Sequence, residues 1–240
     1  MEYGAEEGCD LDDRAQWAAA NPGRVEVSAI EAERRELSPG GFSRERLNIW
    51  PTDRAERVID PDVWASLVSA GPVTGTKPSA IGVDATPAPR REFAVAAAWL
   101  SDGGVHVELD CSDRVDPLDA LAHVVERAGR RIPVVIASDS PAGALIAPMK
   151  AQRCKVAVVS SPEMARAVGG FVDDAHTARL SHDGHPQLAA AVAAARKRPV
   201  GLAGSFGWDY RAEGSVLLVS ATLARFGAVT ARRSGHATFV

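Results

Sequence analysis

One short stretch, residues 79–87, constrains what this chain can fold into more than any other. Residues 80–83 form a compact apolar run, Pro78 and Pro87 bracket it, and a single carboxylate, Asp84, follows directly. A short apolar run between chain breakers is typical of a buried central strand. A carboxylate at the end of such a strand is costly to bury unless it has a partner, and a metal ion or a hydrogen-bonded turn would provide one.

The composition indicates a soluble globular protein with one large domain, or with one domain and an appendage. The chain has 240 residues, of which 46% are hydrophobic and 24% charged, as is ordinary for a protein with a sizeable core. The net charge of -4 excludes a global basic field, so any nucleic-acid binding must come from local groups of Arg and Lys.

Cysteine spacing and hydropathy favour a cytoplasmic protein. Cys9, Cys111 and Cys154 lie far apart without a C-x-x-C pair, which argues against a disulfide framework or a thiolate zinc site. No apolar run approaches the ~20 residues that span a membrane. The acidic first residues do not resemble a signal peptide.

The first part of the chain, residues 1–72, differs from the rest. It is acidic, rich in Arg and interrupted by turn signals, with short helices expected at residues 27–37, 42–49 and 61–68. A Gly- and Pro-rich linker follows, and its glycines and Lys77 lack the G-x-x-x-x-G-K-[ST] spacing of a phosphate-binding loop. We therefore expect a helical, loop-rich segment without a nucleotide site.

Residues 73–240 show a sharper alternation of strands and helices. A hairpin signal at residues 101–104 joins the second and third strands, and Ser-Pro or Asp-Pro pairs open the helices. The expected strands are 80–85, 92–100, 105–110, 132–137 and 156–159; the expected helices begin at Asp116, Ser140, Ser161 and Gln187, a Gly-rich hairpin covers 200–210, and a closing helix runs over 215–226 and ends at Gly227.

This order predicts an α/β fold with a mixed five-stranded sheet flanked by helices. An antiparallel hairpin unit that leads into βαβ units gives such a sheet. The arrangement is that of a ribonuclease H-like fold, in which the first strand is central and pairs with the strand after the first helix.

Several segments carry a more specific resemblance. They resemble the C-terminal nuclease domain of the large terminase subunit of tailed bacteriophages, preceded by the tail of its ATPase domain. The nuclease-like stretches are residues 82–87, 134–145, 171–191 and 213–224, and the tail-like ones are Trp17, Asn21-Pro22 and residues 42–50. The ATPase phosphate loop is missing, so the resemblance implies a fragment or a separately encoded nuclease half.

The resemblance implies a metal-dependent DNA endonuclease with little sequence specificity. In this family, carboxylates hold two divalent ions, Mg²⁺ or Mn²⁺, that hydrolyse the phosphodiester bond. The implied partners are double-stranded DNA, the terminase small subunit, the portal and a separate or missing ATPase half, all in the host cell cytoplasm.

Three acids are the candidate catalytic residues and metal ligands. Asp84 matches the first carboxylate of the family, whereas the second falls on Ala137. The nearest acid, Asp139, lies about 6.6 Å further along an extended chain, too far to replace a direct ligand unless the chain bends after Ala137. Glu213, and less well Asp209, stands at the third position.

Basic side chains are the candidate nucleic-acid contacts. Two groups, Arg90-Arg91 and Arg196-Lys197-Arg198, are the proposed phosphate-binding residues, and further basic groups stand at residues 127–131 and 232–233. Each group alone is more often a solvated charged surface.

Plainer interpretations remain open for the other polar residues. Asp84 could cap a turn with Thr86, Asp139 could begin a helix, and Glu213 could be a solvated acid. The acids Asp173-Asp174 favour an exposed helix face. The three histidines at positions 176, 182 and 185 favour surface positions over a metal cluster.

Two other functions stay open at this stage. Because Ala137 stands where the family has Asp, the chain could be an attenuated or inactive module that positions DNA or docks on packaging partners. It could also be a different ribonuclease H-like nuclease, such as a resolvase or an RNA-degrading enzyme.

Overall fold

The computed structural model describes residues 4–6, 9–23, 25–49, 57–72, 75–87, 93–111, 117–201 and 204–236. Contacts divide the chain into two compact units, Met1–Glu56 and Arg57–Val240. The predicted boundary after residue 72 lies further along the chain than this division. Residues 57–72 pack on the second unit, where the Ser69 amide donates to the His182 carbonyl (3.0 Å).

The first unit is a small helical body. Its helices are α1 (Arg14–Ala20), α2 (Val27–Glu36) and α3 (Pro39–Glu45), of which the sequence predicted the last two. Trp17, Ile30, Phe42 and Leu47 form its buried core, and the Trp17 and Phe42 rings meet edge to face at 5.9 Å. This segment therefore has a core of its own, although its apolar residues are few.

The second unit is built on a six-stranded mixed sheet with the order β5-β4-β1-β2-β3-β6. β1 is central, antiparallel to β2 and parallel to β4, as predicted. The strands are β1 (Ala80–Ala85), β2 (Phe93–Leu100), β3 (Val105–Cys111), β4 (Pro133–Ala137), β5 (Lys155–Val159) and β6 (Leu180–His182), and a separate two-stranded hairpin joins β7 (Lys197–Pro199) to β8 (Phe206–Trp208).

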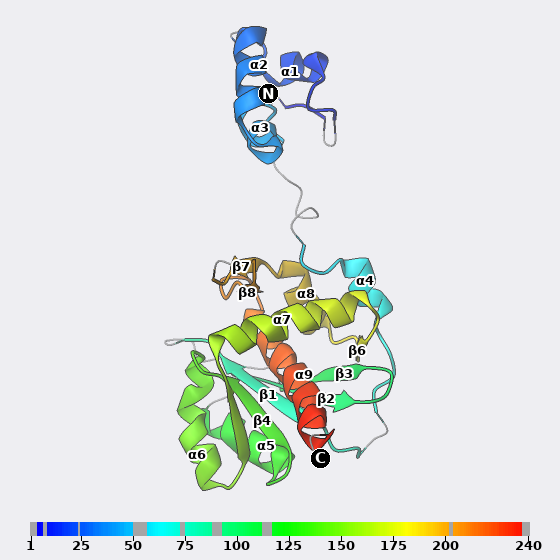
Figure 1. Cartoon of the computed structure of the whole chain (residues 1–240), viewed down its shortest axis with the longest axis vertical. Helices are drawn as coiled ribbons and strands as arrows, with labels where there is room; N and C mark the ends of the chain where they lie inside the picture. The colour runs from blue at the N-terminus through cyan, green and yellow to red at the C-terminus, as the bar shows by residue number, and fades with distance from the viewer. Residues whose placement is uncertain are drawn as a thin grey trace. The chain divides into compact units, whose positions relative to one another are not determined.

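Helices cover both faces of the sheet, which confirms the predicted ribonuclease H-like α/β fold (Figure 1). One face carries α5 (Pro117–Ala128), the 3-10 helix η1 (Pro141–Leu145) and α6 (Ile146–Ala151). The other carries α4 (Pro61–Ser66), α7 (Ser161–His176), α8 (Pro186–Ala194) and α9 (Ser215–His236). Among the described residues, no helix is long and apolar enough to cross a membrane.

Two details of the prediction were wrong. The sheet has a sixth strand, β6, which pairs parallel to β3 and is only three residues long, too short to show a periodic pattern. The closing helix α9 does not end at Gly227 but continues to His236. At Gly227 a side chain would meet Val135 and Ala80, so this glycine serves close packing rather than helix termination.

Residues along β1 alternate between the two layers. Ile81 and Val83 belong to the core under α5 and η1, whereas Ala80 belongs to the core under α9. Because successive side chains of a strand point to opposite faces, Gly82 and Asp84 share the α9 face with Ala80. The candidate carboxylate, Asp84, therefore lies on the face of the sheet that α9 covers.

Small residues allow α9 to lie directly on the sheet. A Cβ at Gly82 would stand 2.0 Å from the Ser220 carbonyl oxygen and 2.4 Å from the Ala224 amide nitrogen. On β2, the neighbouring buried residues of this face are Ala94, Ala96 and Ala98. The backbone of α9 therefore touches the backbone of β1 without room for a side chain between them.

We predict that Gly82→Ala destabilises the protein. The added methyl group would collide with the α9 backbone, which cannot rotate away, so the free energy of unfolding should fall by about 1–3 kcal/mol. Chemical denaturation measures this change.

The matched control is Gly169→Ala, because a Cβ at Gly169 in α7 has no neighbour within 4 Å. This variant should raise the free energy of unfolding by about 0.5–1 kcal/mol. Equal effects of the two variants would contradict the packing argument.

Candidate functional site

Asp84 is fully buried near the end of the central strand. The Ser140 hydroxyl donates a hydrogen bond to Asp84 Oδ1 (2.5 Å) and itself accepts one from the Ala142 amide (3.0 Å). Asp84 Oδ2 is buried and has no hydrogen-bond partner among the described residues. An acceptor atom left without a partner in the interior is costly, and it is the kind of atom that a cation could satisfy.

Burial controls the protonation of this carboxyl. Loss of hydration first, and the charge of Asp139 to a smaller extent, raise the pKa of Asp84 to about 7, against the opposing hydrogen bonds from Ser140 and the Ala85 backbone. In the folded protein the carboxyl therefore holds a proton near neutral pH, which a bound cation would displace.

Asp139 could take the place of a direct ligand only if the chain bends after Ala137. The chain does bend directly after β4. The register pairs Gly82 with Val135, and two residues further on it places Asp84 opposite Ala137. The Ser140 amide then donates to the Ala137 carbonyl (3.1 Å) and closes a tight turn. Asp139 is exposed on this turn, near enough for its charge to act on Asp84.

A small pocket of about 110 Å³ opens beside this turn. Asp139 contributes a carboxylate to its wall, Arg198 a guanidinium and Tyr210 a phenol. Asp84 is buried and is not among the residues of this wall. The complete lining is Asp139, Ser161, Met164, Ala165, Arg198, Val200, Gly207, Trp208 and Tyr210.

The β7–β8 hairpin forms one side of the pocket and is attached to α9. The Trp208 indole N–H donates to the Thr222 hydroxyl (3.0 Å), and both residues are buried. The three predicted phosphate contacts at the start of β7 differ in role. Arg196 donates to the carbonyls of Ala194 and Ala195, Lys197 lies 4.6 Å from the Phe206 ring centre, and Arg198 faces the pocket.

Tyr210 is a pocket residue that the sequence analysis missed. Burial first, and the negative charges of Asp84 and Asp139 second, raise the pKa of its phenol, while Arg198 acts in the opposite direction. The phenol therefore stays protonated and can donate a hydrogen bond to an anionic ligand. The sequence held one weak signal, an aromatic pair around Asp209 just before the closing helix.

The third predicted acid does not join Asp84 and Asp139. Glu213 is exposed before α9, and Asp209 is half-buried, with Oδ1 accepting from the Arg211 amide (3.0 Å). Within the part of the chain that the structure describes, no group of three or more His, Cys, Asp or Glu side chains is assembled to hold a metal ion.

The remaining polar candidates have structural explanations. His182 is buried rather than exposed: Nε2 lies 3.0 Å from the Trp64 carbonyl, and the ring stacks on Trp64 at 4.0 Å. Burial lowers the pKa of His182, so this histidine is a neutral core residue. Asp173 is exposed as expected, but Asp174 is paired with Arg225 (2.6 Å). Arg90 and Arg91 lie outside the described residues.

Comparison with solved structures finds nuclease folds of bacteriophages. The large terminase of bacteriophage HK97 matches 94% of this chain and 56% of its own length, with 20% identity and a TM-score of 0.52. The magnesium-bound large terminase nuclease of thermophilic phage G20c matches 71% of this chain and 96% of its own length, with 14% identity and a TM-score of 0.52. The cobalt-bound form of that nuclease gives 13% identity, the same coverage and a TM-score of 0.51.

These likenesses show that the chain has the ribonuclease H-like fold of large terminase nuclease domains. The chain spans little more than half the length of the HK97 terminase and nearly all of the G20c nuclease. No protein-family model matches the chain, and no curated protein matches its sequence.

We predict that Asp84→Asn stabilises the protein at neutral and higher pH. The folded protein keeps the Asp84 proton up to about pH 7, whereas the unfolded chain releases it near pH 4. The free energy of unfolding of the unsubstituted protein should therefore fall between these values, by at most about 1.4 kcal/mol per pH unit. Asparagine carries no charge at these pH values, so the free energy of unfolding of Asp84→Asn should not fall in this way.

Denaturation curves at pH 4.5 and pH 8, recorded without divalent ions, measure the effect. The gain of Asp84→Asn over the unsubstituted protein should be larger at pH 8. Asp173→Asn, at an exposed position on α7, should show no such difference between the two pH values. A gain that is the same at both pH values would mean that Asp84 is not held in its protonated form.

Proposed function

We propose that this chain is the nuclease module of a phage DNA-packaging terminase, a metal-dependent endonuclease that hydrolyses phosphodiester bonds with little sequence specificity. The single observation that supports this most strongly is the fully buried Asp84, with an unpartnered carboxylate oxygen, near the end of the central strand of a terminase nuclease fold.

The donor atoms of this site fit divalent cations. Asp84 and Asp139 offer hard carboxylate oxygens; a third would have to come from Glu213 or Asp209, which do not join these two acids in the structure. Such oxygens favour Mg²⁺ or Mn²⁺, and the G20c nuclease was solved with magnesium and with cobalt. A pair of these ions would supply an activated water and neutralise the charge that develops on the leaving oxygen.

The chain's own residues would orient the substrate around these carboxylates. Ser140 fixes the Asp84 carboxyl by its hydrogen bond to Oδ1. Arg198 and the protonated phenol of Tyr210, which line the same pocket as Asp139, can hold a phosphate oxygen at the mouth of the site. At about 110 Å³ the pocket itself is too small for a nucleotide, so a DNA strand would have to lie across its mouth.

The proposed partners follow from the packaging role. They are double-stranded DNA, the terminase small subunit, the portal and an ATPase half, meeting in the cytoplasm of the host cell. The match to the HK97 large terminase supports this setting, because it covers 94% of the chain and so extends into the first unit.

A second candidate is an attenuated module that positions DNA without cutting it efficiently. Two observations favour it: Ala137, not an acid, stands opposite Asp84 in the sheet, and no three-acid group is assembled among the described residues. In this case, the fold and the DNA contacts would serve docking on the packaging partners.

We predict divalent-ion-dependent cleavage of plasmid DNA that Asp84→Asn abolishes. Loss of groups that only orient metal ligands already costs 10–100-fold, so loss of a direct ligand should slow cleavage by at least about 100-fold. Agarose-gel assays with Mg²⁺, Mn²⁺ or a chelator measure it. Because the same variant is expected to be more stable, inactivity could not be attributed to unfolding.

Asp173→Asn again provides the control, since it removes one exposed carboxylate away from Asp84 and should cut DNA at the unsubstituted rate. Cleavage by Asp84→Asn at that same rate would refute the proposed mechanism.

We predict that Ala137→Asp distinguishes the two candidates. It places a second carboxylate opposite Asp84, and Ala137→Asn is the matched control of similar size without the charge. In an attenuated module, cleavage should rise strongly with Asp and not with Asn. If the unsubstituted protein already cuts DNA and Ala137→Asp gives no gain, Asp139 serves as the second ligand and the attenuated reading is wrong.

A further inference from the structure

Five of the six sheet strands run in one direction, so they begin at one edge of the sheet. β1 is parallel to β4, β4 to β5, and β3 to β6, while β2 is antiparallel to both β1 and β3. We call the edge where β1, β3, β4, β5 and β6 begin the strand-start edge. Asp84 lies toward the opposite edge, near the end of β1.

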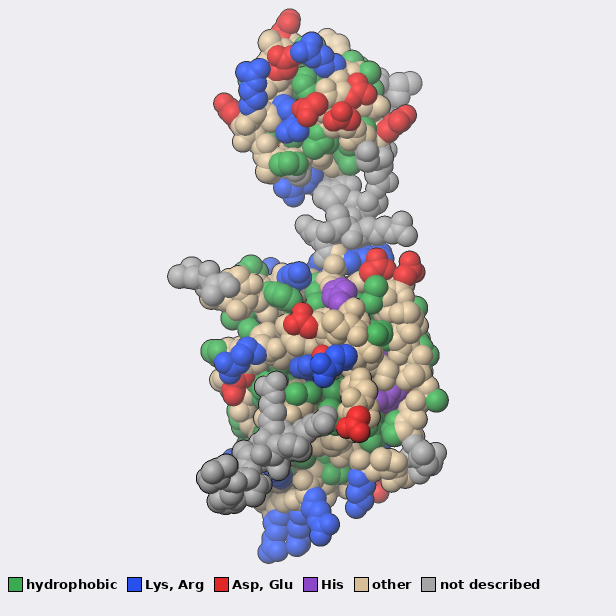
Figure 2. Space-filling view, turned by 45° about the vertical axis from the view of Figure 1, so that its right-hand side comes forward, with side chains coloured by type: hydrophobic (Ala, Val, Ile, Leu, Met, Phe, Trp, Pro, Cys, Tyr) green, Lys and Arg blue, Asp and Glu red, His purple; other side chains and the backbone are tan. Residues whose placement is uncertain are grey.

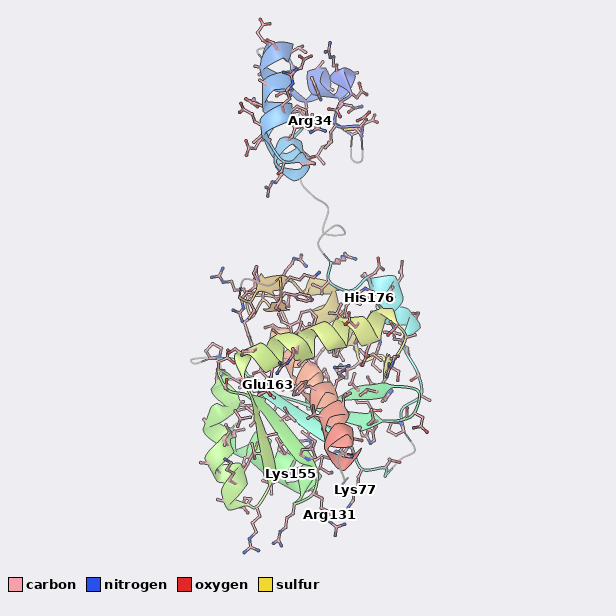
Figure 3. The ribbon with its side chains drawn as sticks, viewed as in Figure 1. Arg34, Lys77, Arg131, Lys155, Glu163 and His176 are labelled. Atoms are coloured by element: carbon pink, nitrogen blue, oxygen red, sulfur yellow. The ribbon has the colours of Figure 1, made fainter. Side chains whose placement is uncertain are left out.

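Exposed cations precede or open four of these strands. Each side chain is exposed, and the sheet order spreads them over the whole width of the sheet. The six are Lys77 before β1, Arg130 and Arg131 before β4, Arg153 and Lys155 at β5, and Arg179 before β6. Figure 3 shows the labelled side chains of Lys77, Arg131 and Lys155 at this end of the unit, and Figure 2 shows Lys and Arg side chains gathered at its lower end.

These cations have no acidic partner in the described parts of the chain. None of the six forms an ion pair with another residue that the structure describes. Arg127, nearby on α5, is different because it pairs with Asp110 (3.0 Å). The turn between β2 and β3 contributes one acid, Asp102, to this edge. A chain with a net charge of -4 thus carries a local excess of positive charge here.

One of the six, Arg153, has a strained backbone. It has φ +64° two residues after the end of α6, a left-handed position that glycine normally occupies. A bulky residue in this region is strained, and such strain is found where the side chain has a role. Glycine adopts this backbone conformation without strain, so Arg153→Gly would remove the cation and relieve the backbone at once.

A pocket lies between the middle of the row, at β1, and its end at β6. It measures about 490 Å³, and both Lys77 and Arg179 line it. Hydroxyl groups of Ser69, Thr76, Ser79, Ser101 and Ser181 also line it. Cations together with hydroxyl donors are the groups that bind phosphate oxygens in protein–DNA interfaces.

We propose that the six cations of the strand-start edge bind the phosphodiester backbone of double-stranded DNA, at a second contact separate from the Asp84 site. This inference rests on the proposed function, which supplies DNA as the ligand. Six strands at a spacing of about 4.8 Å span about 24 Å, which corresponds to roughly two thirds of a turn of the duplex. The row is therefore long enough to follow several successive phosphates, without reading the base sequence.

The test compares two doubly substituted full-length proteins of equal net charge. Arg131→Gln/Lys155→Gln removes two cations of the row, and Arg35→Gln/Arg44→Gln removes two exposed cations of the first unit. Binding of a fluorescent 30-base-pair duplex is followed by anisotropy in a chelating buffer at several salt concentrations. The row variant should bind about tenfold more weakly or worse and lower the salt slope by about two, since each phosphate contact contributes about one.

A third variant separates binding from folding. Arg153→Gly removes a cation and relieves the left-handed backbone, so it should weaken DNA binding without lowering the midpoint of thermal unfolding. Arg153→Lys should restore most of the binding.

Each outcome of the binding experiment either supports or overturns the proposed DNA contact. Selective weakening by the row variant supports the second contact. Equal weakening by both double variants, or no change in either, overturns it, and the latter result is expected if the row instead docks an acidic protein. Cleavage assays with Asp84→Asn stay independent: if Asp84→Asn cuts normally while the row variant still loses binding, the nuclease mechanism fails and the DNA contact stands.

Discussion

The close contact between α9 and the small-residue face of β1 and β2 is the interaction on which the rest of the second unit depends. Gly82 and the alanines of β2 leave no side chain between the helix and the strands. The helix in turn holds the β7–β8 hairpin through the bond between Trp208 and Thr222. The pocket beside Asp139 is therefore positioned by the packing of α9 on the sheet together with the hydrogen bond from Trp208 to Thr222.

That packing explains how a carboxylate can stand inside the core. On the α9 face of β1 there is steric room for Asp84, but the described residues provide no hydrogen-bond donor for Oδ2. Ala137, opposite it, adds no further repulsion. An acid at that position would increase the cost of folding and also increase the attraction for cations. The residue at position 137 therefore affects how much the burial of Asp84 costs the second unit in stability.

Much of the fold could be predicted from the sequence, because the strands are short apolar runs between Pro, Gly and Ser signals. β6 could not, since three residues show no period and its pairing with β3 depends on contacts distant in sequence. Gly227 was misread because an identical residue can end a helix or admit a neighbouring strand. Asp84 was identifiable from its position after an apolar strand. Ser140 and Tyr210 were not identified as site residues, because only the folded chain brings their side chains to Asp84 and Asp139.

The direction of the strands determines at which edge of the sheet the charged residues beside each strand lie. Because five of six strands are parallel, a residue just before a strand and a residue just after it lie at opposite edges of the sheet. Asp139 follows β4, whereas Arg130 and Arg131 precede it. The same ordering holds at β1, with Lys77 before the strand and Asp84 near its end. A chain whose total charge is only -4 can therefore hold a group of carboxylates and a cationic surface one strand length apart, so that the two do not neutralise each other.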